Sequence, residues 1–259
     1  MLRRMTVLGF LLAVLPACSD SETAAGPGSS ACAPLRNVED VVRVYGSAWN
    51  EEDAEKRLCA LDQSMIDTAT YVDPTIDTAN LPDLADAIGD FQLSAPKASI
   101  AQLSGLDVRS GELRFAWDFQ NDGVSAITGL DYMEIASDGR IASIRGYWNP
   151  LPSEPPTGVL ADYVAAWKAG DAASRDASLA LAVTDDVRFT SPDATTTGRA
   201  ALSDAMGVSI EVTGAQSYPK YGRVAFRIEA RDDVTDYVHF GTDGKIVRIA
   251  RFVGPLPAL

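Results

Sequence analysis

The fold of this chain is decided by a stretch that occurs twice, LDYMEIASDGRIASIRGYWNPLP at residues 130–152 and TDYVHFGTDGKIVRIARFVGPLP at residues 235–257. In each copy, two runs of residues favourable for β-strands flank a Ser-Asp-Gly or Thr-Asp-Gly turn, which predicts a long β-hairpin. The copies start 105 positions apart. A unit that recurs at this separation predicts two tandem domains rather than a short-period solenoid.

An earlier part of each unit is also repeated, as TYVDPTI at residues 70–76 and RFTSPDA at residues 188–194. These copies lie 118 positions apart, so the second unit lacks 13 residues between its two matching stretches. The first copy has Asp73 where the second has Ser191. The segment SEPPTG at residues 153–158 has the composition of a linker between the two units.

Each unit begins with helical periodicity and continues with strand periodicity. Apolar residues spaced for one helix face occur at 38–49 and again at 160–167, and each set is followed by two further helical segments. Residues 112–119 then alternate between apolar and polar, which is typical of a strand with one buried face. Helices followed by an antiparallel meander predict an α+β fold with the helices on one face of the sheet.

Composition excludes one class of partner. The chain has 259 residues, of which 46% are hydrophobic and 22% charged, and its formal net charge is −14. Phosphate backbones are bound by basic surfaces, so we expect no nucleic-acid partner. We also expect no cofactor and no metal, because the sequence has neither a glycine-rich phosphate loop nor a metal-ligand constellation.

The N-terminal segment MLRRMTVLGFLLAVLPAC has a basic start and a short apolar run. The run is shorter than a membrane-spanning helix, so residues 1–17 are predicted to be a signal peptide. Because LPAC resembles a bacterial lipobox, Cys18 is the predicted lipidation site and residues 18–35 a flexible tether. The predicted location is the cell envelope, lipid-anchored, facing the periplasm or on the outer membrane if the organism is Gram-negative. The alternative is a soluble secreted protein cleaved elsewhere.

Two further cysteines remain if Cys18 carries lipid. Cys32 and Cys59 form an even pair in an oxidising compartment, and the helices near them are able to bring them together. We therefore predict a disulfide rather than two free thiols. A metal site is disfavoured, because two thiols are too few and the single histidine, His239, is far away in sequence.

The sequence resembles the nuclear transport factor 2-like superfamily, which includes ketosteroid isomerases and SnoaL-like polyketide cyclases. YVAAWKAGD at residues 163–171 looks like the first-helix signature of the isomerases, and DYVHFGTDGKIVRIARF at residues 236–252 looks like their late hairpin. The resemblance implies two cone-shaped domains, 36–152 and 158–259, each with about three helices packed on a curved antiparallel sheet. It is weak evidence about activity, because one scaffold of this kind hosts many functions.

The isomerase site that the resemblance implies falls on Tyr45, Asp73 and Asp131 in the first domain. Asp73 would be the general base, and the other two would donate hydrogen bonds to an enolate oxygen. The second-domain equivalents are Tyr163, Ser191 and Asp236, so the second copy lacks the base. Ordinary structural roles fit as well: an aspartate before proline is a common turn former, and a tyrosine on a helix is often a core residue.

Strand parity places Asp131 on the face that would line a pocket. With the aromatic strand and the first helix, this face gives an apolar cavity suited to a flat hydrophobic ligand. Its expected lining residues are Trp49, Phe115, Trp117, Met133, Ile144 and Trp148. In the second copy Arg251 replaces Gly146, so it would either pair with Asp236 and close that pocket or offer an anion site.

Three functions fit these patterns. The first is a lipid-anchored binding protein whose first domain holds a small hydrophobic molecule. The second is an enzyme of the isomerase or cyclase type, acting only in the first domain. The third is a non-catalytic interaction module, in which the two domains pack as an internal pseudo-dimer or present a surface to an envelope partner.

Overall fold

The structure is a computed structural model that describes residue 35 and residues 37–206, 209–229 and 232–259. All of these residues belong to one compact unit, residues 33–259. The predicted signal peptide, the predicted lipidation site at Cys18 and almost all of the predicted tether lie outside the described residues. Cys32 lies outside them as well, so lipidation and the disulfide stay predictions.

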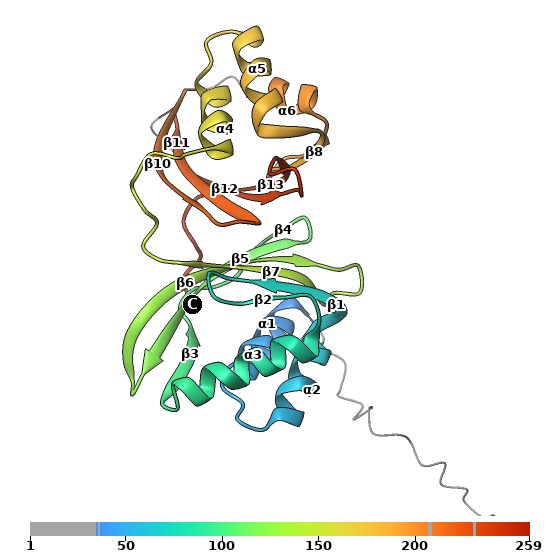
Figure 1. Ribbon diagram of the computed structural model, residues 1–259, viewed down its shortest axis with the longest axis vertical. Helices are drawn as coiled ribbons and strands as arrows, with labels where there is room; N and C mark the ends of the chain where they lie inside the picture. The colour runs from blue at the N-terminus through green and yellow to red at the C-terminus, as the bar shows by residue number, and fades with distance from the viewer. Residues whose placement is uncertain (1–34, 36, 207–208, 230–231) are drawn as a thin grey trace, which may run out of the picture. The chain divides into compact units, whose positions relative to one another are not determined.

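The chain folds as two α+β domains whose elements follow the same order, except that β4 of the first domain has no counterpart in the second (Figure 1). The elements of the first domain are α1 (Val38–Ala48), α2 (Ala54–Ser64), β1 (Met65–Val72), β2 (Asp77–Thr78), α3 (Leu81–Ser94), β3 (Ala98–Gln102), β4 (Asp107–Arg109), β5 (Glu112–Asn121), β6 (Val124–Ile135) and β7 (Ile141–Trp148). Those of the second are α4 (Val159–Lys168), α5 (Ala172–Ala182), β8 (Val183–Thr190), β9 (Thr195–Thr197), α6 (Arg199–Ala205), β10 (Ile210–Ser217), β11 (Tyr221–Ile228), β12 (Asp232–Phe240) and β13 (Ile246–Val253).

The two sheets have equivalent strand orders. The first runs β2-β1-β7-β6-β5-β3, with β4 also paired to β5, and the second runs β10-β11-β12-β13-β8-β9. Read in opposite directions, these are the same sequence of strands. Both sheets are mixed rather than wholly antiparallel, because β1 pairs in parallel with β7 and β8 in parallel with β13. A parallel pair arises here because the first and last strands of each domain are joined through a long connection rather than a hairpin.

Local sequence fixes where several helices begin. The side chains of Asn37, Asp53, Asn80 and Asp171 each accept a hydrogen bond from a backbone N–H in the first turn of α1, α2, α3 and α5. Such caps satisfy donors that have no partner within the helix. The second domain has a shorter third helix, seven residues in α6 against 14 in α3, which accounts for part of its missing length.

Each domain has its own hydrophobic core between its helices and its sheet. In the first domain Leu61, Ile88 and Met133 are fully buried there. Leu179, Leu202 and Ile249 are fully buried in the second. The helices therefore cover one face of each sheet, as the sequence predicted.

The opposite faces of the two sheets share a third cluster of buried residues. Its members are Leu130, Tyr132 and Tyr147 from the first domain and Tyr221, Tyr237, Ala250 and Phe252 from the second. Tyr132 and Tyr237, which are equivalent positions in the repeat, stack on each other with ring centroids 5.2 Å apart and planes 7° apart. A residue that contacts its own counterpart is typical of a twofold-related interface.

Hydrogen bonds and ion pairs flank this cluster. The Tyr147 hydroxyl donates to the Gly222 carbonyl at 2.9 Å, and the Tyr221 hydroxyl donates to the Gly146 carbonyl at 2.9 Å. Arg248 forms ion pairs with Glu112 and, at 3.0 Å, with Glu134. These contacts pair most of the polar groups at the interface, as is usual for buried groups. The buried Tyr132 hydroxyl is an exception, since it has no hydrogen-bond partner.

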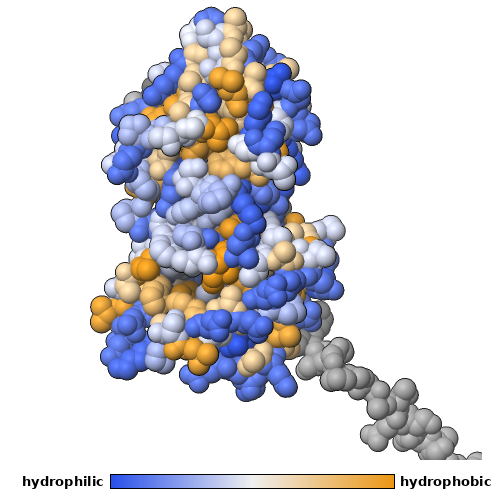
Figure 2. All heavy atoms as spheres, viewed as in Figure 1, coloured by the Kyte–Doolittle hydropathy of each residue, from blue (hydrophilic) through white to orange (hydrophobic). Residues whose placement is uncertain are grey.

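The described surface is mostly hydrophilic on the face shown in Figure 2, with small groups of hydrophobic side chains between the polar ones. Leu93 and Val124 are among the exposed large hydrophobic residues. Among the described helices, none is both long enough and apolar enough to span a membrane.

Candidate functional site

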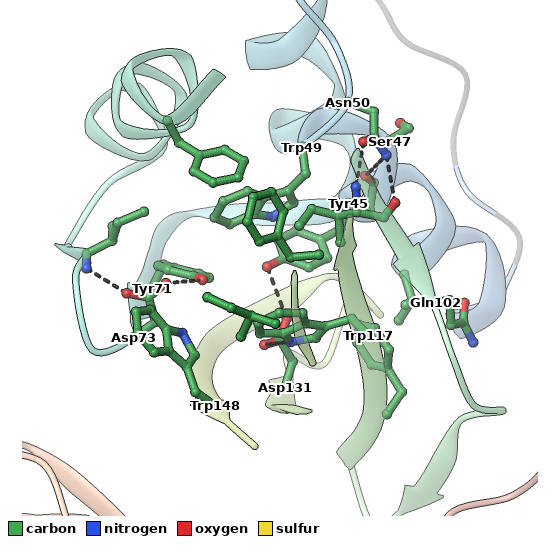
Figure 3. A pocket seen from close by; sticks show the side chains of 18 of the residues that line it. Tyr45, Ser47, Trp49, Asn50, Tyr71, Asp73, Gln102, Trp117, Asp131 and Trp148 are labelled. Atoms are coloured by element: carbon green, nitrogen blue, oxygen red, sulfur yellow. Dashed lines mark hydrogen bonds between the residues drawn. The ribbon is translucent and has the colours of Figure 1, made fainter. Parts of the chain in front are cut away.

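A cavity of about 510 Å³ lies between the helices of the first domain and its sheet. Its walls come from α1, α3 and strands β1, β3, β5, β6 and β7, so segments far apart in sequence meet there (Figure 3). Most of the large side chains in these walls are aromatic: Tyr45, Trp49, Tyr71, Phe91, Phe115, Trp117, Phe119 and Trp148. Two carboxylates, Asp73 and Asp131, also face it.

Asp131 is buried on the cavity wall with two donors directed at it. The Tyr45 hydroxyl donates to Oδ2 at 3.2 Å, and the indole N–H of Trp117 donates to Oδ1 at 2.9 Å. Burial raises the pKa of Asp131 from 3.8 to about 7. The two hydrogen bonds lower this pKa and the charge of Asp73 raises it, but loss of hydration is the larger effect.

The Tyr45 hydroxyl stays protonated in this environment. Burial raises the pKa of Tyr45 well above its usual 10.0, and the nearby Asp131 raises it further. Tyr45 therefore acts as a hydrogen-bond donor and not as a phenolate. Tyr45 comes from the buried face of α1 and Asp131 from β6, so the contact depends on packing the helix against the sheet.

Gly129 makes room for the second donor. A Cβ on Gly129 would overlap the indole ring of Trp117, which pairs with it across β5 and β6. The indole therefore lies flat over the glycine backbone, and its N–H reaches Asp131 two residues along the strand. The glycine at this position is a packing requirement of the site.

Asp73 combines the turn role with a place at the cavity. Its Oδ1 accepts from the backbone N–H groups of Thr75 and Ile76, both at 2.6 Å, and from the Thr75 hydroxyl at 2.9 Å. Its Oδ2 accepts from the Tyr71 hydroxyl at 2.9 Å. Four donors therefore hold the Asp73 carboxylate in place, three of them within its own turn.

The two carboxylates meet around Gly146 on β7. A Cβ on Gly146 would lie 2.9 Å from the Asp73 Cβ, 3.4 Å from Asp131 Oδ1 and 3.5 Å from the Tyr71 hydroxyl oxygen. Because glycine has no side chain, Asp73 is able to lie close to β7, beside the space in front of Asp131. Figure 3 shows Asp73 and Trp148 on one side of this space and Asp131 with Trp117 on the other.

The second domain fills the corresponding space with Arg251. The Arg251 guanidinium donates to both oxygens of Asp236, at 2.8 Å each, and Asp236 is fully buried. The Tyr163 hydroxyl also donates to Asp236, at 2.6 Å. Burial lowers the pKa of Arg251, but the Asp236 charge more than offsets this and the net direction is upward. Two roles were predicted for Arg251, an ion pair with Asp236 and an anion site, and the structure shows the ion pair.

The structure brings together most of the residues predicted for the first pocket. Tyr45, Asp73 and Asp131 converge on it, and the lining includes Trp49, Phe115, Trp117 and Trp148. Met133 and Ile144 differ from the expectation: both are fully buried in the hydrophobic core and do not line the cavity. They share strand parity with Asp131, but they lie further along β6 and β7, beneath the helices.

Sequence reasoning missed Tyr71 as a cavity residue. It lies two positions before Asp73 on β1, so strand parity places both side chains on the same face. Phe91 was missed because its position on α3 depends on how that helix packs against α1. In the second domain, Ser191 stays in its turn, where its hydroxyl donates to the Ala194 carbonyl at 3.1 Å.

Within the part of the chain that the structure describes, no group of three or more histidine, cysteine, aspartate or glutamate side chains is placed to hold a metal ion. The donors around the cavity are aromatic hydroxyls, an indole and two carboxylates. The chemistry available there is hydrogen bonding, proton transfer and charge stabilisation.

No family profile matches the chain, and no curated protein is similar to it. Among solved structures, a SnoaL-like family protein from Agrobacterium tumefaciens is 26% identical, with a TM-score of 0.41, and covers 42% of this chain and 95% of its own. An NTF2-like protein of unknown function from Cytophaga hutchinsonii is 13% identical, with a TM-score of 0.35, and covers 45% and 93%.

A SnoaL-like protein of unknown function from Burkholderia thailandensis is 11% identical, with a TM-score of 0.37, and covers 45% of this chain and all of its own. Each of these proteins matches a length that corresponds to about one domain of this chain. The prediction of two tandem α+β domains with this architecture is confirmed. The chain consists of two tandem α+β domains with equivalent strand orders.

Proposed function

We propose that the first domain binds a small hydrophobic molecule in the cavity against Asp131. The observation that carries this proposal is the open, aromatic cavity of about 510 Å³, which is within the range of small-molecule sites. Its walls supply apolar contact area, and Tyr45, Trp117 and Asp131 supply a few polar groups that would orient a ligand.

The second domain has a different role in this proposal. Arg251 and Asp236 occupy the space that a ligand would need, so this domain contributes structure rather than binding. We propose that it packs on the first as an internal pseudo-dimer. The stacked pair of Tyr132 and Tyr237 supports this arrangement. The Gly146 carbonyl accepts a hydrogen bond from Tyr221 of the second domain, and Gly146 lies beside the cavity residues Asp73 and Asp131.

Binding can be tested with the neutral fluorescent probe N-phenyl-1-naphthylamine. We expect saturable binding of one probe per chain and a rise in Tm, because a ligand that binds only the folded state stabilises it. Two variants should abolish both effects. Gly146→Arg places a side chain where Arg251 lies in the second domain, and Ser47→Trp places a large ring at the exposed rim of the cavity.

Gly170→Ala is the matched control, since a Cβ at Gly170 meets nothing within 4 Å and the residue is outside the cavity. Far-UV circular dichroism of each variant checks that it is folded. The binding proposal is wrong if the wild-type chain does not bind the probe. It is also wrong if Gly146→Arg and Ser47→Trp both bind the probe as well as wild type does. A non-catalytic interaction module would then be the better description.

Proton transfer is the second candidate function, and one observation favours it. Asp73, Asp131 and Tyr71 all approach the position in front of Gly146, so a base and protonated donors face one point. An enzyme of the isomerase or cyclase type would use Asp73 as base, with Tyr45 and Asp131 as oxyanion donors. We place binding first because both oxygens of Asp73 already accept hydrogen bonds, from its own turn and from Tyr71.

The enzyme candidate is tested by exchange of α-protons in deuterated water. Proton NMR follows the α-proton signals of a panel of cyclic enones. These signals should disappear faster with wild-type protein than without it. Asp73→Asn should remove the acceleration, and Ser191→Ala in the second domain should not. Equal exchange with wild type and Asp73→Asn would exclude Asp73 as the base.

We also propose that the chain is exported and anchored by lipid on Cys18, with Cys32 and Cys59 joined as a disulfide. The apolar N-terminal run and the lipobox-like LPAC support this proposal. Metabolic labelling with an alkyne fatty acid should mark the wild-type chain, and Cys18→Ala should be unlabelled and released from membranes. Mass spectrometry with and without reductant should show two more alkylated thiols after reduction.

A further inference from the structure

In the second domain, the pocket that corresponds to the first cavity is occupied by the cationic side chain of Arg251. Arg251, on β13, makes two hydrogen bonds to the fully buried Asp236. Only 8% of the Arg251 side chain is exposed, so protein groups rather than water surround the guanidinium. A buried cation is stable there because a carboxylate and polarisable rings replace its hydration.

Three aromatic rings enclose that guanidinium. Its central carbon lies 4.3 Å from the ring centroid of Trp167, 5.0 Å from that of Phe189 and 5.0 Å from that of Phe226. These distances are within the range of cation–π attraction. The pocket of the second domain is therefore an aromatic cage closed by one carboxylate.

The first domain has the same cage without the arginine. The counterparts follow from the repeat offsets and from strand pairing: Trp49 for Trp167, Tyr71 for Phe189, Trp117 for Phe226, Asp131 for Asp236 and Gly146 for Arg251. Four of these first-domain residues line the cavity, and Gly146 lies beside three residues of its lining, Asp73, Asp131 and Tyr71. A Cβ on Gly146 would lie 2.9 Å from the Asp73 Cβ and 3.4 Å from Asp131 Oδ1, so this position adjoins both carboxylates, as Arg251 adjoins Asp236.

The charges at the first cavity are unbalanced. Asp73 and Asp131 are both directed at it, and among the described residues of its lining Arg43 is the one basic side chain. Arg43 pairs with Asp40 and its side chain is 68% exposed, so it leaves the carboxylates of the cavity without a cation. Anionic ligands are disfavoured at such a site, and a cation would complete it.

From these contacts we infer that the ligand of the first domain is an organic cation, an amidinium, guanidinium or ammonium group carried on a hydrophobic body. This inference rests on the proposed binding function and names its ligand class. The cation would lie in front of Gly146, against Asp131, between the rings of Trp49, Tyr71 and Trp117 (Figure 3). Each oxygen of Asp131 accepts one hydrogen bond at present and can accept another.

Three probes of one size separate the ligand classes. Benzamidine is a cation, benzamide is neutral and benzoate is an anion, and all three carry the same ring. At pH 8, calorimetry should give benzamidine at least about tenfold tighter binding than benzamide, and no measurable binding of benzoate. Asp131→Asn should bring benzamidine close to benzamide, because it removes the charge and keeps the shape.

The second domain offers an independent test by chemical rescue. Arg251→Gly recreates the situation of Gly146 in the first domain and leaves Asp236 without a cation. Methylguanidinium should raise the Tm of Arg251→Gly by several times more than that of wild type at equal concentration. Arg227→Gly, which removes an exposed arginine, should show no such difference.

The outcomes distinguish this inference from the binding proposal. If benzamide binds as tightly as benzamidine and both bind equally to Asp131→Asn, the cavity binds hydrophobic molecules but the cation inference is wrong. If N-phenyl-1-naphthylamine and all three probes fail to bind the wild-type chain, the binding proposal fails with it. Selective benzamidine binding that Asp131→Asn removes supports the inference, even if Arg251→Gly does not fold.

Discussion

Replacing Arg251 with leucine should destabilise the second domain strongly. The substitution removes both hydrogen bonds to Asp236 and leaves a fully buried carboxylate without its cation. Removing one partner of a buried ion pair costs about 3–5 kcal/mol. Leucine fits the apolar walls but offers no donor, and the hydrogen bond from Tyr163 remains as the only side-chain support that the structure shows for Asp236.

Differential scanning calorimetry of the full chain measures this loss. At roughly 2–4 °C per kcal/mol for a chain of this size, the transition of the second domain should shift down by roughly 6–20 °C. Arg227→Leu is the matched control, since its side chain is 49% exposed and pairs with the exposed Asp233. An exposed ion pair contributes about 0–1 kcal/mol, so this control should stay close to wild type.

A double-mutant cycle with Asp236→Asn isolates the pair. The double variant Arg251→Leu with Asp236→Asn should be more stable than Arg251→Leu alone, because the unpaired charge is gone. Two results would refute the reasoning: a shift for Arg251→Leu no larger than for Arg227→Leu, or a double variant whose loss equals the sum of the two single losses.

Three further predictions concern the first domain. Because burial raises the pKa of Asp131 from 3.8 to about 7, the folded chain keeps a proton that the unfolded chain loses, and stability should fall as pH rises from about 4 to about 7. Chemical denaturation should show a fall of up to about 4 kcal/mol relative to Asp131→Asn, and parallel pH profiles would contradict this. Gly129→Ala should lower the free energy of unfolding by about 1–3 kcal/mol, because the added Cβ displaces Trp117. The near-UV circular dichroism spectrum should change as well. Gly170→Ala should alter neither the free energy of unfolding nor the spectrum. Asp73→Ala should lower the free energy of unfolding by about 1–2 kcal/mol, measured by thermal unfolding, because it removes the hydrogen bonds of the turn. Asp73→Asn should lower it less, because asparagine keeps an acceptor oxygen. Equal losses would show that the turn does not depend on that acceptor.

The repeat made most of the architecture predictable. Residues 130–152 and 235–257 predict a hairpin in each domain, and β6–β7 and β12–β13 are those hairpins. Helices α1 and α4 follow the predicted apolar stripes. The parallel pairing of β1 with β7 was not predictable from periodicity, because alternation of side chains is the same in parallel and antiparallel strands.

The candidate site was predictable only in part. The resemblance to the isomerases predicted that Tyr45, Asp73 and Asp131 share one pocket, and strand parity placed Asp131 on the pocket face, because parity depends on local phase along a strand. Parity also assigned Met133 and Ile144 to the pocket, where the structure has them in the core. Phase gives the face of a strand, but the depth of a side chain along that face depends on where the helices cover it.

The sequence by itself determined the two repeats, the α+β order of their elements, the acidic balance and the exchange of Gly146 for Arg251. These properties follow from composition and short-range pattern. Only the tertiary structure decided that Arg251 enters a cage of aromatic rings and pairs with Asp236, while Gly146 leaves the matching cage open. The physical reason is that burial, charge compensation and cavity volume arise from contacts between strands and helices far apart in the chain, which no local pattern records.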